Sequence, residues 1–386
     1  MNNNYEPVLQ KIRQLFNEPQ AFIPLHAPYF GGNEKKYVLE TIDSTFVSSV
    51  GPFVSRFEEM MCDITGAGYA IATMNGTTAL HLALLVAGVK AGDAVITQPL
   101  TFAATANAIA HAGAQPIFVD VDRDTLGLSP QALEVWLHEH AEVKEGICKI
   151  KSTGQKIAAC VPMHSFGFPV RIRELMEVCK KFSIVIVEDA AESLGSYVEN
   201  KHTGNFGLLG IFSFNGNKTI TSGGGGAIVT SDEKLGKLAK HLSTTAKVPH
   251  AYEFRHDQVG YNYRMPNLNA ALACAQLEQL DIFLKNKREL ALTYKEYFSS
   301  RNETFVWERE GTVANFWLNT ILFSNQEEQR SFLEYSNENK IMTRPIWQLM
   351  NKLPMFQTCL KGDLSNAIWL EERVVNIPSS YRASKK

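Results

Sequence analysis

Residues 213–226, SFNGNKTITSGGGG, place one lysine, Lys218, between a polar turn and a run of four glycines. Upstream of it, Asp189 ends the apolar run VIVED at 185–189. A lysine amine can form an imine with an aldehyde, and a carboxylate can keep a pyridine nitrogen protonated. The pair therefore predicts a site for a pyridine cofactor that carries an aldehyde. Taken alone, Lys218 could be a solvated surface lysine and Asp189 a helix N-cap.

Residues 75–78, NGTT, precede an apolar helical pattern. Free N–H groups at a helix N-terminus, together with threonine hydroxyls, suit a phosphate ester, although simple capping would also explain them. Phe102 follows a short apolar strand, where its ring could stack on a flat cofactor or pack in the core. These residues add a phosphate site and a ring-stacking position to the predicted cofactor site.

Two further groups lie in loops. Residues 260–266, GYNYRMP, form a polar aromatic turn in which Asn262 and Arg264 could bind an anion. The same turn could simply lead into the helix that follows it. His164, just past the strand at 157–161, could contact cofactor or substrate or serve a structural role.

The elements that must position these residues alternate along the chain. Short apolar segments predict strands at 69–74, 94–97, 116–119, 157–161 and 184–187, and periodic segments predict helices at 79–87, 103–111, 130–140 and 171–182. This alternation predicts an α/β fold with a mostly parallel sheet of right-handed βαβ units. Ligands of such sheets bind outside the carboxyl ends of the strands, where several of the polar residues above are expected.

The pattern of predicted helices and strands divides the chain into three parts. Residues 1–35 predict an N-terminal arm, 36–245 a large cofactor-binding domain, and 246–386 a smaller C-terminal α+β domain that opens with a long helix over 266–288. A length of 386 residues is sufficient for two or three domains.

Composition excludes several classes of function. Of the residues, 45% are hydrophobic and 20% are charged, and the net charge is −2, without a basic stripe for nucleic acid. No apolar run approaches the roughly 18 residues that span a bilayer. The first residues lack the pattern of a secretion signal, and the six cysteines are scattered without metal-ligand spacing. We therefore expect a cytoplasmic protein with reduced thiols and no membrane, nucleic-acid or metal partner.

Five stretches together carry a specific resemblance over nearly the whole chain: 75–80 (NGTTAL), 118–122 (FVDVD), 187–193 (VEDAAES), 213–226 and 260–264 (GYNYR). The chain resembles the nucleotide-sugar aminotransferases of the DegT/DnrJ/EryC1/StrS family. The resemblance implies a fold-type I scaffold, like that of aspartate aminotransferase, and pyridoxal 5′-phosphate as cofactor. Members with histidine in place of the lysine are dehydratases, so Lys218 favours transamination. Many members carry an acid among the glycines, and its lack here is not expected to abolish activity.

The resemblance also implies a role for single residues. Lys218 binds the cofactor as an imine and later moves a proton, and Asp189 pairs with the pyridine nitrogen. Phe102 stacks on the ring, and Glu192 holds a cofactor or substrate position that is acidic or amide in the family. The phosphate ligands are Gly76, Thr77 and Ser213, with Asn262 arriving from the neighbouring subunit of a homodimer with shared active sites.

Residues 23–28 (IPLHAP) and 43–53 resemble most the branch of the family that makes legionaminic acid and bacillosamine precursors. That branch, which serves surface-polysaccharide biosynthesis, aminates C4 of a UDP- or GDP-linked 2-acetamido-4-keto-6-deoxy sugar. L-glutamate is the donor and leaves as 2-oxoglutarate. The sugar pocket is expected to draw on Ser48, His164, Glu192, Trp317 and Arg344. Another pyridoxal phosphate reaction, such as dehydration, and a non-catalytic sensor of nucleotide sugars are the alternatives.

Overall fold

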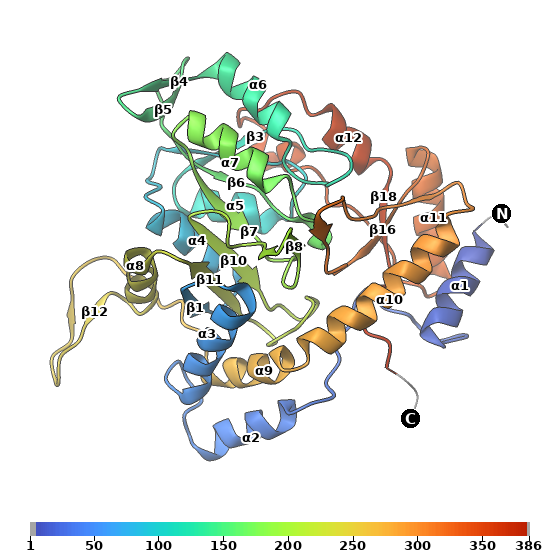
Figure 1. Cartoon of the computed structure of the whole chain (residues 1–386), viewed down its shortest axis with the longest axis horizontal. Helices are drawn as coiled ribbons and strands as arrows, with labels where there is room; N and C mark the ends of the chain where they lie inside the picture. The colour runs from blue at the N-terminus through green and yellow to red at the C-terminus, as the bar shows by residue number, and fades with distance from the viewer. Residues whose placement is uncertain (1–4, 384–386) are drawn as a thin grey trace.

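The computed structural model, which describes residues 5–383, places a seven-stranded sheet at the centre of the chain (Figure 1). Neighbouring strands are parallel except around β11, which is antiparallel to both of its neighbours. In order across the sheet the strands are β1 (Tyr69–Thr73), β11 (Gly226–Thr230), β10 (Leu209–Ser213), β7 (Val185–Asp189), β6 (Ile157–Val161), β2 (Ala94–Thr97) and β3 (Gln115–Phe118). The predicted α/β fold with a mixed, mostly parallel sheet is confirmed.

Helices cover both faces of this sheet, because its strands carry apolar side chains on both sides. Ile71 of β1 belongs to the core under one face, whereas its neighbours Ala70 and Ala72 belong to the core under the other. The first core includes helices α4 (Gly76–Val86), α5 (Ala103–His111) and α8 (Glu233–Ser243). The opposite face packs against α3 (Pro52–Thr65), α6 (Pro130–His140), α7 (Ile172–Lys181) and α9 (Asn267–Leu277).

The C-terminal part has its own four-stranded antiparallel sheet, in the order β14 (Thr304–Phe305), β16 (Asn319–Leu322), β18 (Val374–Ile377) and β17 (Arg344–Pro345). Its core is shared by α10 (Leu280–Phe298), α11 (Gln326–Glu338) and, from the other end of the chain, α1 (Glu6–Phe16). In the predicted N-terminal arm, residues 1–35, α1 packs with the C-terminal sheet; α2 (Glu34–Asp43), which begins where the arm ends, lies against α9.

The long helix predicted over 266–288 is wrong as one element, because the structure breaks it into α9 and α10 at Glu278 and Gln279. Side chains at the break have partners in α2 and α3: Glu278 accepts a hydrogen bond from Arg56, and Gln279 donates to Glu34. These tertiary contacts accompany a change of direction that the sequence pattern did not show.

Shorter elements complete the structure. The hairpin of β12 (Lys247–Val248) and β13 (Arg255–His256) extends away from the body (Figure 1). Also present are β4 (Ala141–Lys144), β5 (Ile147–Ile150), β8 (Tyr197–Val198), β9 (Lys201–His202), β15 (Thr312–Val313), α12 (Ser365–Glu371) and the 3-10 turns η1 (Ser165–Gly167), η2 (Met350–Lys352) and η3 (Pro354–Phe356). Among residues 5–383, no helix is long and apolar enough to cross a membrane.

Candidate active site

A cavity of about 340 Å³ lies where β7 and β10 end and where α4 and α5 begin. This is the edge of the sheet at which the alternating pattern predicted a ligand. Eight of the predicted residues line it: Gly76, Thr77, Phe102, Asp189, Glu192, Ser213, Lys218 and Trp317. Four others do not: Ser48, His164, Asn262 and Arg344.

Lys218 lies in the loop between β10 and β11. Ser213 and Gly226 face each other in the register of these strands, so the loop leaves and re-enters the sheet at the same point. The lysine Nζ lies 3.0 Å from Glu192 Oε1 and 4.0 Å from the centroid of the Trp317 ring. With its side chain 13% exposed, Lys218 points into the cavity rather than into solvent.

Asp189 is the last residue of β7 and is buried. Thr105 Oγ1 donates to its Oδ2 at 2.7 Å, and the Ala191 N–H donates to its Oδ1 at 3.2 Å. Burial raises the pKa of Asp189, while these two donors and the charge of Lys218 act in the opposite direction. Within residues 5–383 no cation is in hydrogen-bond contact with this buried carboxylate, which is the partner that a protonated pyridine nitrogen requires.

The N-terminus of α4 fits a phosphate. Asn75 caps the helix by accepting a hydrogen bond from the Thr78 N–H at 2.8 Å, and the N–H groups of Gly76 and Thr77 come earlier in the same turn. A Cβ built on Gly76 would come within 2.8 Å of Ser213 Cβ. Glycine is therefore needed for the helix to start this close to β10, beside the Ser213 hydroxyl. With Lys218 and Asp189 in the same cavity, the residues present fit pyridoxal 5′-phosphate.

Glu192 is the second buried carboxylate of the cavity. Its Oε2 accepts a hydrogen bond of 2.8 Å from the Phe166 N–H, and its Oε1 faces Lys218. Burial raises the pKa of Glu192, and the charge of Lys218 opposes this shift.

Aromatic side chains form the remaining walls. Phe102 is 53% exposed at the start of α5, so its ring is available for stacking. Trp317 is fixed by a hydrogen bond of 2.6 Å from its Nε1 to the carbonyl of Asn217. Trp347 also lines the cavity, and its ring centroid lies 4.8 Å from that of Phe166.

Sequence reasoning missed Trp347 and Thr105. Trp347 lies in the C-terminal part, beyond the short strand β17, and nothing in its neighbourhood marks a ligand site. Thr105 could have been predicted, because it follows Phe102 by three residues in the first turn of α5, at the sheet edge where ligands were expected.

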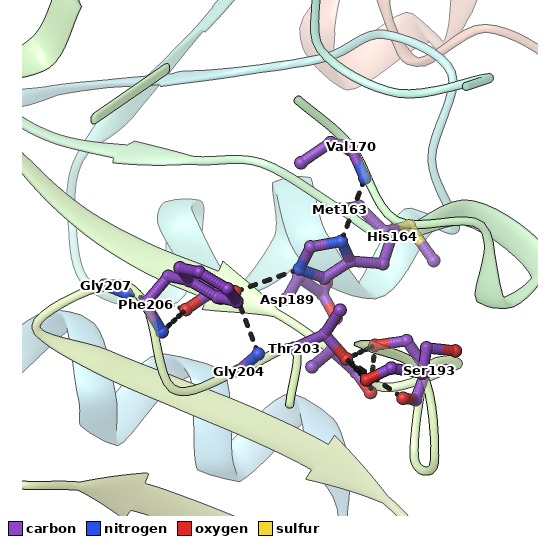
Figure 2. A network of polar contacts seen from close by, with 12 residues as sticks. Met163, His164, Val170, Asp189, Ser193, Thr203, Gly204, Phe206 and Gly207 are labelled. Carbon is purple, nitrogen blue, oxygen red and sulfur yellow. Dashed lines mark hydrogen bonds and ion pairs between the residues drawn. The ribbon is translucent and has the colours of Figure 1, made fainter. Parts of the chain in front are cut away.

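His164 does not line the cavity, and its ring lies in a buried polar network (Figure 2). Its Nε2 lies 3.0 Å from Glu188 Oε2, and its Nδ1 accepts a hydrogen bond from the Val170 N–H. The same glutamate accepts bonds from the N–H groups of Gly204, Phe206 and Gly207. The structure thus gives His164 a structural environment, in place of the predicted position in the sugar pocket.

The other three predicted residues lie at the surface. Asn262 accepts hydrogen bonds from Arg264, and its side chain is exposed. Ser48 is exposed in the loop between α2 and α3, and Arg344 donates to Asn337 at 3.1 Å. Within one copy of the chain, these three residues therefore do not line the cavity.

Comparison with known proteins adds a family to this geometry. Residues 28–386 match the DegT/DnrJ/EryC1/StrS aminotransferase family. The GDP-perosamine synthase of Escherichia coli O157:H7 is 37% identical over 335 residues, which are 87% of each chain. The "Putative pyridoxal phosphate-dependent aminotransferase EpsN" of Bacillus subtilis (strain 168) is 36% identical over 339 residues, 88% of this chain and 84% of EpsN. The solved structure of Helicobacter pylori PseC, an aminotransferase involved in the biosynthesis of pseudoaminic acid, has a TM-score of 0.83 at 25% identity and covers 92% of this chain and 93% of PseC.

Proposed function

Because the chain belongs to the DegT/DnrJ/EryC1/StrS aminotransferase family, we propose that it transfers an amino group to C4 of a nucleotide-linked 4-keto-6-deoxy sugar. The enzyme is an aminotransferase that uses pyridoxal 5′-phosphate. The observation that carries the proposal is the joint position of an amine, a buried carboxylate and a helix N-terminus in one cavity.

The bound cofactor supplies an electron sink for the charge left when a Cα–H bond breaks. Lys218 Nζ would hold the cofactor, and its amine would carry a proton as a general base and acid. Asp189, whose Oδ2 accepts a hydrogen bond from Thr105, would keep the pyridine nitrogen protonated. The start of α4, with Ser213, would hold the phosphate. Phe102, Trp317 and Trp347 form the aromatic walls of the cavity.

The acceptor is proposed as a GDP- or UDP-linked sugar. The name of the Escherichia coli relative supports GDP, and the resemblance of residues 23–28 and 43–53 to the legionaminic acid and bacillosamine branch supports a 2-acetamido group. L-glutamate is the proposed donor, and it leaves as 2-oxoglutarate. In the sugar pocket, Glu192 and Trp317 are the predicted residues that already face the cavity.

A homodimer with shared active sites completes the proposal. Asn262 lies outside the cavity of its own chain, in an exposed turn beyond the extended hairpin of β12 and β13. That position is compatible with reaching the phosphate of a neighbouring subunit. Ser48 and Arg344, which are also exposed, are proposed to act from the same interface. Six free cysteines suit the reducing cytoplasm, where we place the enzyme.

The test combines a substrate panel with one variant. Purified protein is incubated with L-glutamate and each of the GDP- and UDP-linked 4-keto sugars, and the aminated sugar and 2-oxoglutarate are measured by mass spectrometry. Lys218→Ala is expected to lose at least the 10²- to 10⁴-fold supplied by proton transfer, and also the covalent link to the cofactor. Undiminished turnover by Lys218→Ala would contradict the proposal, and so would a protein that stays colourless with added cofactor.

A further inference from the structure

Glu192 is a buried carboxylate next to the reacting nitrogen, and the roles above leave its charge without a task. Its Oε1 lies 3.0 Å from Lys218 Nζ, which is within hydrogen-bond distance. Asp189 is the carboxylate assigned to the pyridine nitrogen, and the cofactor and sugar-pocket positions proposed for Glu192 assign no proton transfer to its carboxylate.

The two oxygens of Glu192 have different surroundings. Oε2 is occupied by the Phe166 N–H, which the turn η1 presents from a left-handed backbone conformation, with φ at 57°. Such a conformation is unfavourable in a residue other than glycine, and it persists where surrounding contacts determine it. Because Oε2 is fixed in this way, Oε1 is held toward the lysine and remains available for a proton.

We propose that Glu192 and Lys218 share one proton, so that Glu192 is a catalytic acid–base partner of the lysine nitrogen. In one state Nζ carries the proton and Glu192 is a carboxylate. In the other, an N–H bond at Nζ breaks, an O–H bond forms at Oε1, and both groups are neutral. No oxidant or further reactant is needed. The inference rests on the proposed function in one respect, namely that Lys218 bonds to the cofactor.

The charges around the pair make both states accessible. On the carboxylate side, Asp189 raises the pKa of Glu192, in addition to the larger effect of burial. On the lysine side lie His26, whose ring nitrogens have no hydrogen-bond partner in residues 5–383, and the buried Lys287. Burial lowers the pKa of Lys287 to about 7 and that of His26 well below its usual value, so each carries less positive charge than an exposed side chain of its kind.

Each state has a use. With the cofactor held by Lys218, a proton on Nζ would favour displacement of the lysine by the amine of the donor. Once released, Lys218 must instead be neutral to remove the donor Cα proton, and Oε1 can accept the proton that the lysine loses. A glutamine at this position could keep the hydrogen bond from Phe166 but could neither carry a charge nor store a proton.

The decisive experiment compares Glu192→Gln with the wild type in the absence of substrates. The absorbance of the cofactor bound to Lys218 is titrated with pH, because it reports whether the lysine nitrogen is protonated. Loss of the carboxylate is expected to move the midpoint to lower pH by about one pH unit or more. Glu58→Gln is the control: Glu58 lies outside the cavity, pairs with Lys240 and accepts a hydrogen bond from the Ala72 N–H, so its replacement should leave the midpoint unchanged. Coincident midpoints for Glu192→Gln and wild type would overturn the proposal.

A second readout does not require the cofactor. Lys218 in the cofactor-free protein is acetylated with acetic anhydride over a range of pH, and its labelled peptide is quantified by mass spectrometry. The midpoint of labelling should again fall by about one pH unit or more in Glu192→Gln, since the carboxylate stabilises the unreactive ammonium form. If the protein never binds the cofactor covalently, the proposed function fails, while this labelling still decides whether the pair exists. Identical labelling profiles would overturn the pair.

Discussion

At the scale of single residues, the cavity separates two acids that differ in their partners. Asp189 is held by a hydroxyl and a backbone N–H, whereas Glu192 lies against an amine. Both are buried, and burial raises the pKa of each. Keeping an ionised carboxylate buried without a bound cation therefore destabilises the folded protein, and a bound cofactor would offset that destabilisation.

Asp189→Asn should stabilise the cofactor-free protein while abolishing its function. The raised pKa means that, over a range of pH, the folded chain holds a proton on Asp189 that the unfolded chain has released. The free energy of unfolding of the wild type therefore falls as pH rises through the folded-state pKa of Asp189. Asparagine can keep the hydrogen bond with Thr105 but does not ionise, so the variant does not lose stability as the pH rises.

Urea unfolding of both cofactor-free proteins at pH 8, and again below the usual carboxyl pKa of about 3.9, measures the effect. The variant should be the more stable at pH 8, and the gap should narrow in acid. Equal stabilities at pH 8 would show that Asp189 is not destabilising. Added cofactor should stabilise the wild type more than the variant.

At the scale of elements, the periodic spacing of apolar residues in the sequence predicted most strands and helices that carry the site. The strands at 94–97 and 157–161 and the helices at 103–111 and 130–140 have the predicted bounds. The order of the strands could not be predicted, because β1 pairs with β11, which lies far from it in the sequence, and no local pattern indicates that pairing. For the same reason Trp347, which reaches the cavity from the C-terminal part, has no signal in its own neighbourhood.

Glu188 shows how one side chain fixes a loop between elements. It follows the buried strand residue Val187, yet its carboxylate accepts hydrogen bonds from three backbone N–H groups in 204–207 and contacts His164. Burial would raise the pKa of Glu188, but His164 and these donors outweigh it and lower the pKa. This loop leads into β10, and so it sets the strand that ends at Ser213.

Glu188→Gln should destabilise the fold by about 3–5 kcal/mol, because its amide group would leave buried donors without a carboxylate. Thermal and urea unfolding measure this loss. Glu177→Gln, on the exposed face of α7, is the control and should change stability by no more than about 0.5 kcal/mol. A stability loss for Glu188→Gln no larger than that of the control would contradict the role assigned to the network.

At the scale of the whole molecule, apolar side chains remain at the surface of one chain. Tyr252 and Phe254, near the tip of the extended hairpin, are each 81% exposed, and Phe46 and Val50 are exposed in the loop after α2. Scattered exposed residues are ordinary, but exposed aromatics on a projecting hairpin suit a surface that a second copy covers.

A mixing experiment tests whether the active sites are shared. Lys218→Ala and Asn262→Ala should each be nearly inactive as pure dimers. If Asn262 serves the neighbouring subunit, a hybrid dimer has one site with both native residues. After subunit exchange in equal amounts, half of the dimers are hybrids with one working site of two, so about a quarter of wild-type activity should return. Activity no higher than the mean of the two pure variants would show that both residues serve the same chain.

Trp317 has one more consequence. It belongs to the C-terminal part of the chain, yet its ring covers Lys218 and its indole N–H holds the Asn217 carbonyl, one residue before the lysine. The lysine loop thus acquires its final surroundings only after ribosomal synthesis has passed the large sheet and delivered residue 317. A nascent chain that has made only its first half therefore lacks both the ring and the hydrogen bond that Trp317 contributes to the lysine loop.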